Sequence, residues 1–256
     1  MLKRLCLALI ALMLLTAPGC ALNAGARVPK GELLMGNSII YGAVNPVVLN
    51  YNPQAVDPTY DQMVVFLNRD RTDLQPYVEG VRVCAEFAEE VYNNAEASGI
   101  RTAFVMLSGV DHALNAFETT DRGLVYVDCT GQQAGNVSAV PSGSTVFGQP
   151  TSWDKIAYVQ VGEPVGVISL STALNYGLDY SSYGAWLSDK ATFDALQEQI
   201  QIELAGRTVV PPTEYAILQT TQQAETDLAN KLGGFWEGSG ADGTVTGISV
   251  FWQGHN

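Results

Sequence analysis

The feature that most constrains the fold is an amphipathic helical pattern followed at once by three strand patterns. From Cys84 to Ser98, apolar side chains recur at every third or fourth position, which places them on one stripe of a helix. Gly99 follows, where a glycine commonly ends a helix. The next segments, 100–107, 112–120 and 124–130, are apolar and β-branched or alternate in polarity, as strands do. A helix followed by consecutive antiparallel strands predicts an α+β domain.

The flanking sequence divides into a tether, a core and a C-terminal part. Residues 21–50 are rich in Gly, Asn, Pro and Ala and indicate a tether with loose early structure. We assign residues 51–149 to the core, and residues 150–256 to the same domain or an accessory subdomain. Periodicity and turn residues predict further elements in these parts. They are a helix within 58–70, a hairpin over 155–161 and 164–170, helices at 183–205 and 213–232, and a strand within 244–254.

Residues 1–20 have the pattern of a signal peptide. Their apolar run, Leu5–Leu15, is shorter than the roughly 20 residues that span a bilayer and fits a secretory leader. Small residues and Cys20 follow it, which resembles a bacterial lipoprotein leader, in which such a cysteine becomes the lipidated N-terminus. Plain cleavage after Ala21 or Ala24 is the alternative. We therefore expect an extracytoplasmic protein, anchored to the membrane through Cys20 or else secreted.

The acidic net charge of the chain argues against nucleic acids and anionic lipids as binding partners. The chain has 256 residues with 13 basic and 26 acidic side chains, and its net charge is −13. It contains no basic stripe, so we expect no nucleic-acid binding, because that affinity depends on neutralising phosphates. Binding to anionic lipid head groups is disfavoured for the same reason. The acidity mainly promotes solubility, and nothing in the sequence specifies an oligomeric state.

The spacing of Cys84, His112 and Asp128 predicts a cysteine nucleophile. Such a nucleophile needs an ionisable thiol, a base to take the proton and a group that orients the base. Cys84 lies in the first turn of the predicted helix, where free N–H groups and the helix dipole favour a thiolate. His112 begins the second strand and Asp128 lies on the third. The other histidine, His255, is next to the last residue and is set aside.

The length of one hairpin loop decides whether His112 and Asp128 can meet. Faces alternate along a strand, so residues an even number of positions apart share a face only if the loop has an odd number of residues. A three-residue loop, Thr120–Arg122, makes them diagonal neighbours, and a five-residue loop, Glu118–Arg122, makes them direct partners. An even loop would put them on opposite faces.

Cys129 leaves three alternatives open. A Cys84–Cys129 disulfide is feasible outside the cytoplasm, but alternation turns Cys129 away from the face of Asp128. The disulfide and the triad are therefore mutually exclusive unless the strand bulges. A zinc site needs four converging ligands, and the same alternation keeps Cys129 out of one. In the third alternative, Cys84 is only a small buried apolar residue.

These motifs together resemble the transglutaminase-like superfamily, whose papain-like core has a cysteine on a helix and His and Asp on neighbouring strands. The resemblance covers about residues 60–131 and rests on the cysteine at a helix start, "HALN" from His112 and "VDCT" around Asp128. Leu114 stands where the family often has an aromatic residue, and Cys129 where it has proline. The resemblance implies that Cys84 is the nucleophile, His112 the general base and acid, and Asp128 the orienting carboxylate.

The function implied is a thiol hydrolase or acyltransferase that acts on a polypeptide or carboxamide substrate. The chemistry requires no cofactor and no metal. One oxyanion donor is expected from the backbone N–H of Cys84, and a second from the loop Pro76–Val83. The alternative function is a non-catalytic envelope binding or assembly module on the same fold.

Overall fold

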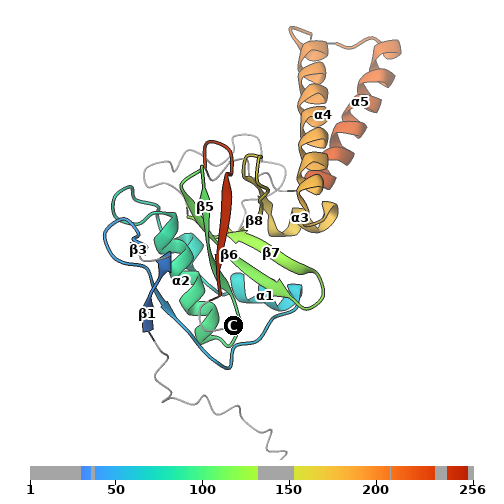
Figure 1. The fold of residues 1–256 in the computed structure, drawn as a ribbon. Helices are drawn as coiled ribbons and strands as arrows, with labels where there is room; N and C mark the ends of the chain where they lie inside the picture. The colour runs from blue at the N-terminus through green and yellow to red at the C-terminus, as the bar shows by residue number, and fades with distance from the viewer. Residues whose placement is uncertain (1–29, 36–37, 132–152, 208, 234–240, 253–256) are drawn as a thin grey trace, which may run out of the picture.

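A six-stranded antiparallel sheet forms the centre of the molecule (Figure 1). The computed structural model describes residues 30–35, 38–131, 153–207, 209–233 and 241–252. The spatial order of the strands is β10-β5-β6-β7-β8-β9. The strands are β5 (Ala103–Ser108), β6 (His112–Thr119), β7 (Gly123–Asp128), β8 (Lys155–Tyr158), β9 (Gly166–Ser169) and β10 (Gly247–Phe251). The mixed α+β class predicted from the sequence is confirmed.

Two helices pack on one face of this sheet. The helix α1 (Tyr60–Leu67) starts with a capping box in which Thr59 and Gln62 each accept the other's backbone N–H. The helix α2 (Cys84–Ala97) matches the predicted amphipathic helix. Its apolar stripe is buried against β5 and β6. The buried apolar residues of α2 are Ala85, Phe87, Ala88, Val91, Tyr92 and Ala95.

The hairpin between β6 and β7 has the register that a triad needs. Thr119 pairs with Gly123, so the loop is the three-residue Thr120–Arg122. Asn115 pairs with Val127. Extending this register places His112 and Asp128 as diagonal neighbours at the open end of the hairpin.

The region for which the sequence indicates a tether carries short strands. They are β1 (Lys30–Glu32), β2 (Leu34–Met35), β3 (Ser38–Ile39) and β4 (Val48–Asn50). Polar side chains of α2, spaced three or four residues apart, accept backbone N–H groups from residues 43–52, because they lie on one helical face. The acceptors are Glu86, Glu89, Asn93 and Glu96, and the donors are Ala43, Val48, Asn50 and Asn52.

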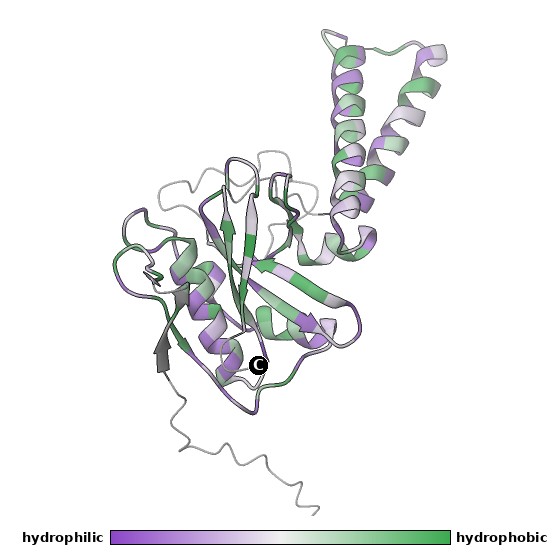
Figure 2. Cartoon of the chain, in the orientation of Figure 1, coloured by the Kyte–Doolittle hydropathy of each residue, from purple (hydrophilic) through white to green (hydrophobic). Residues whose placement is uncertain are grey.

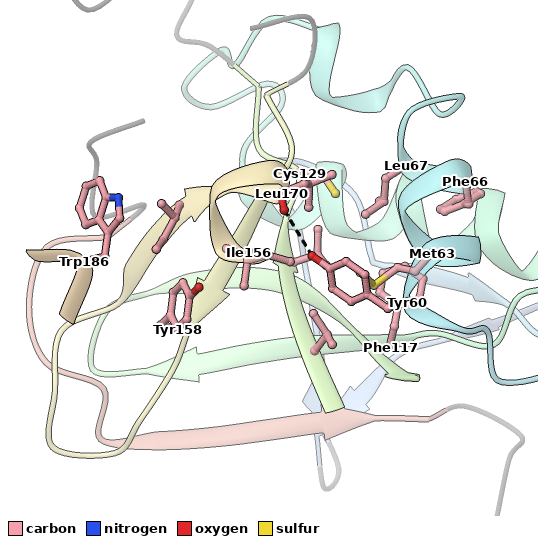
Figure 3. Close-up of a cluster of buried hydrophobic side chains, with 14 of the residues drawn as sticks. Tyr60, Met63, Phe66, Leu67, Phe117, Cys129, Ile156, Tyr158, Leu170 and Trp186 are labelled. Carbon is pink, nitrogen blue, oxygen red and sulfur yellow. Dashed lines mark hydrogen bonds between the residues drawn. The ribbon is translucent and has the colours of Figure 1, made fainter. Parts of the chain in front are cut away.

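The largest hydrophobic cluster lies between α1 and strands β6 to β9. Figure 3 shows Tyr60 and Met63 of α1 facing Phe117 and Ile156 of the sheet. The Tyr60 hydroxyl donates to the carbonyl of Leu170 at 3.4 Å. The burial of these large side chains holds α1 on the sheet, because each removes apolar surface from water.

The C-terminal helices form an arm that projects from the sheet (Figure 1). The short helix α3 (Leu170–Tyr176) leads into α4 (Tyr180–Leu204), which pairs with α5 (Pro212–Leu232). Apolar residues appear on the outside of this arm as well as inside it (Figure 2). Among the residues that the structure describes, no helix is both long enough and apolar enough to cross a bilayer.

Candidate active site

Cys84 is the first residue of α2, and Glu86 fixes the start of this helix. The Glu86 carboxylate accepts the backbone N–H of Val83 at 3.0 Å and that of Ala43 at 2.5 Å. A Cβ on Gly42 would lie 2.2 Å from a Glu86 oxygen, so a larger residue there would displace this carboxylate. Cys84 is half-buried at the helix tip, where free N–H groups and the dipole favour negative charge.

His112 is held between Asp128 and Cys84. It follows Asp111, whose φ of 46° lies in the left-handed region that Asp tolerates. Its Nε2 lies 3.1 Å from Oδ2 of Asp128, and the two side chains are 3% and 1% exposed. Cys84 lies close enough to the same ring to help raise its pKa. Because Nε2 faces Asp128, Nδ1 is the ring nitrogen left for the thiol.

The electrostatics of this pair favour an imidazolium beside a carboxylate. Burial would lower the pKa of His112, but the charge and hydrogen bond of Asp128, together with Cys84, raise it to about 10. Burial would likewise raise the pKa of the Asp128 carboxyl. The charges of Lys155 and His112, and hydrogen bonds from His112 and Thr130, hold that pKa well below its usual range instead. His112 is therefore protonated at neutral pH and can donate a proton to a leaving group.

Lys155 is a member of this site that was not predicted from the sequence. Its Cα is paired with that of Asp128 across β7 and β8. The side chain is nearly buried, and Nζ donates to the carbonyls of Trp153 and Thr130 at 2.8 and 3.1 Å. A lysine that starts an otherwise apolar strand pattern, "KIAYVQV", was the signal available in the sequence.

The loop before Cys84 lies directly against the end of β7. A Cβ on Gly131 would lie 2.0 Å from the carbonyl oxygen of Gln75 and 2.9 Å from Phe87, so only glycine fits there. Tyr77 stacks on Phe87, with ring centroids 6.5 Å apart and planes at 7°. Burial and the charge of Cys84, followed by nearby carboxylates, raise the pKa of Tyr77. Tyr77 therefore forms a wall beside the thiol that the sequence did not reveal.

Asn115 locks α2 onto the sheet close to His112. It is fully buried on β6, and its Nδ2 donates to the carbonyl of Ala88 in α2 at 2.9 Å. This bond ties the cysteine helix to the strand that carries the histidine. Asn115 carries no signal in the sequence, because a polar residue in an alternating strand predicts a solvent-facing position.

Cys129 lies apart from the other three predicted residues. It is a free cysteine, as is Cys84, and it packs in the hydrophobic cluster beside α1 (Figure 3). Burial, followed by the charge and hydrogen bond of Asp154, raises the pKa of the Cys129 thiol well above its usual value. The structure therefore brings Cys84, His112 and Asp128 together and leaves Cys129 on the other face of β7.

Other predicted features lie outside the described residues or are not seen within them. Cys20, the predicted lipid attachment site, and His255 both lie outside the described ranges. Within those ranges, no cluster of three or more His, Cys, Asp or Glu could hold a metal ion. Neither a scan of protein-family models nor searches of curated proteins and solved structures gave a match to this chain.

Proposed function

We propose that the protein is a thiol-dependent hydrolase or acyltransferase with a transglutaminase-like, papain-like core. The observation that carries this proposal is the series of contacts from Cys84 through His112 to Asp128. The His112–Asp128 bond is 3.1 Å long and almost fully buried, and Cys84 stands at a helix tip near enough to the ring to influence its pKa. These are the nucleophile, base and orienting group that acyl transfer needs.

In the proposed first step, Sγ of Cys84 attacks a carboxamide or peptide carbonyl carbon. As the tetrahedral intermediate collapses, the carbon–nitrogen bond breaks. His112 gives its proton to the departing nitrogen, which leaves as an amine, and a thioester remains on Cys84. Asp128 keeps the ring in place and compensates its charge throughout. The backbone N–H groups at the tip of α2 are suited to stabilising the oxyanion.

In the second step, water attacks the thioester carbon. His112 accepts a proton from this water, the carbon–sulfur bond breaks, and a carboxylic acid is released. The proton then returns the Cys84–His112 pair to its starting state. If a second amine attacks in place of water, the product is a new amide. We favour hydrolysis, as the family resemblance implies for exported prokaryotic members.

The place of action we propose is the outer side of a cell membrane. The leader pattern and Cys20 support a lipid anchor, which would hold the enzyme at a surface through several acyl chains. The substrate class is a polypeptide or carboxamide presented at that surface.

Activity-based labelling tests the proposed function. Native protein is treated with iodoacetamide at pH values from 5 to 9, and adducts on Cys84 and Cys129 are counted by peptide mass spectrometry. We expect Cys84 to react rapidly at mildly acidic pH and Cys129, which is 2% exposed, to stay unmodified. The protein is then incubated with cell-surface proteins as the source of substrate. A covalent acyl-enzyme should be trapped in the wild type and should be absent in Cys84→Ala.

Two results would contradict this function. One is slow alkylation of Cys84 with the pH profile of a free thiol. The other is equal trapping in the wild type and in Cys84→Ala. Either result favours the binding or assembly module. Cys129→Ala serves as the matched control, because it removes the second thiol without touching the His112–Asp128 bond.

A further inference from the structure

Lys155 occupies the position from which a single side chain can fix the Asp128 carboxylate. We propose that Lys155 is a positioning residue of the site, because its ammonium joins the two backbone carbonyls beside Asp128 and places a buried positive charge next to that carboxylate. This inference rests on the proposed function and deepens it. It adds a fourth side chain to the three predicted from the sequence, one that acts through Asp128 and not on substrate.

Thr130 transmits the effect of Lys155 to Asp128 through the two peptide groups on either side of it. The Thr130 N–H donates to Oδ1 of Asp128 at 2.8 Å. The Thr130 carbonyl accepts from Nζ of Lys155 at 3.1 Å. Thr130 is therefore held from both sides, and it presents its N–H to the oxygen of Asp128 that His112 does not use. The carboxylate consequently has a partner on each oxygen, which fixes its rotation.

Lys155 also joins two segments that come together at the site. Nζ donates to the carbonyl of Trp153 at 2.8 Å, and the Trp153 N–H donates to Oδ2 of Asp73 at 2.6 Å. Asp73 is buried in the short 3-10 helix Thr72–Leu74, which begins the loop that leads to Cys84. Gly131 lies tightly against the same loop. Lys155 thus ties the Asp128 side of the site to the segment that precedes the nucleophile.

The charges around Asp128 give Lys155 its electrostatic role. A buried carboxylate is costly unless cations and hydrogen bonds compensate it. Lys155 and His112 are the two cations that act on Asp128. Other titratable groups facing this region belong to α2, to the residue after β7, to the residue before β8 and to residues 70–73. They are Cys84, Cys129, Asp154, Asp70 and Asp73. The carboxylates and thiols add no positive charge. Removal of Lys155 therefore leaves His112 as the remaining cation of the two that act on Asp128.

The test compares three variants in the full chain. Lys155→Met keeps the apolar stem and removes the ammonium, and Lys155→Arg restores the charge. The matched control is Lys231→Met on the arm, where Lys231 pairs with Asp189. The readouts are the pH profile of iodoacetamide alkylation at Cys84 and the carboxyl ¹³C titration of Asp128. In Lys155→Met, we expect the acidic side of the Cys84 alkylation profile and the midpoint of the Asp128 titration each to shift to higher pH by about one unit or more. A shift of this size is typical of losing a neighbouring opposite charge.

The control results are equally specific. Lys155→Arg should lie closer to the wild type than Lys155→Met does, and Lys231→Met should superimpose on the wild type. A merely structural lysine would change the amount of folded protein but not these pH profiles. Coincident profiles for the wild type and a folded Lys155→Met would overturn the proposal.

A measurement on the wild type covers the case in which Lys155→Met does not fold. The Lys155 ammonium is followed by ¹H–¹⁵N NMR while Asp128 is titrated with acid. We expect its signal to shift together with the Asp128 carboxyl carbon, and a signal that ignores this titration overturns the proposal. The Asp128 and Lys155 signals are read without substrate or turnover. A failure of the proposed enzyme activity would therefore be distinguishable from a failure of the Lys155 proposal.

Discussion

The helix that carries the cysteine, α2, and the first long helix of the arm, α4, differ in how much of each is buried. The helix α2 has 14 residues, of which seven are buried, whereas α4 has 25 residues, of which three are buried. The polar face of α2 accepts backbone N–H groups from residues 43–52. The polar face of α4 instead carries an ion pair four residues apart, Lys190 with Asp194, in which the aspartate side chain is 54% exposed.

Because of this difference, the positions of side chains are fixed around α2 and are less constrained on the arm. On α2, the four acceptors Glu86, Glu89, Asn93 and Glu96 each bind a backbone N–H of residues 43–52, so small displacements are costly and the Cys84–His112–Asp128 arrangement is held. On the arm, most side chains face water and single surface contacts contribute little. We therefore expect substitutions around α2 to change stability and thiol reactivity, and most substitutions on the arm to change neither.

The largest effect should come where the arm joins the sheet. Trp186 of α4 is 1% exposed and packs in the large cluster, while its neighbour Leu187 is 45% exposed. Trp186→Ala should lower the free energy of unfolding by about 3–5 kcal/mol, because it leaves a cavity. Leu187→Ala should change it by no more than about 0.5 kcal/mol. Urea titration followed by circular dichroism measures both, and equal costs would break the proposed contrast within α4.

The next largest effect should be on thiol reactivity. His112→Gln removes the imidazolium beside Cys84 and should lower the alkylation rate of Cys84 at pH 6 by about 10²-fold. The matched control, His255→Gln, removes the other histidine of the chain and should leave this rate unchanged. Stopped-time alkylation with mass spectrometry gives both rates. If the two variants reacted alike, His112 would not be the partner of the thiol.

The free energy of unfolding should depend on pH because His112 and Asp128 form a buried pair near α2. Asp128 has a lowered pKa, so its contribution to the free energy of unfolding is present above pH 3.8, the usual pKa of the group. This contribution is lost as the pH falls below that value. His112 has a pKa raised from 6.5 to about 10, so its contribution is complete below pH 6.5 and is lost between pH 6.5 and 10.

We therefore expect the free energy of unfolding to be greatest between about pH 4 and 6.5 and to decline on both sides, by up to about 5 kcal/mol toward pH 10. Urea midpoints measured across this range provide the test. Asp128→Asn removes the carboxylate that raises the His112 pKa and should flatten the alkaline decline. An unchanged decline in Asp128→Asn would assign it to other groups.

The elements around the site were predictable because they depend on local periodicity. The apolar stripe that begins at Cys84 predicts α2 to within one residue of its observed end. An odd hairpin loop was one of the conditions derived from the positions of His112 and Asp128, and the observed loop has three residues. Alternation also places Cys129 on the other face from Asp128, where it packs in the core.

What the sequence did not predict depends on contacts between distant segments. Glu86, Glu89 and Asn93 look like a solvent-facing stripe, yet they bind residues 43–50, more than 40 positions away. Lys155 reaches Asp128 only because β8 pairs with β7 across the intervening residues. No local pattern encodes such pairings, so neither the covering of α2 nor the fourth member of the site could be derived from spacing.

The smallest effect should come from the far end of the arm. Ile202 near the end of α4 and Ile217 in α5 are 66% and 60% exposed, so folding removes little of their surface from water. The double variant Ile202→Ser, Ile217→Ser should therefore change the free energy of unfolding by about 0.5 kcal/mol or less and leave Cys84 alkylation at its wild-type rate. Urea titration and the alkylation assay measure the two quantities on the same preparation. A loss of thiol reactivity in this folded variant would show that the arm and the site act as one unit, contrary to the separation argued from burial.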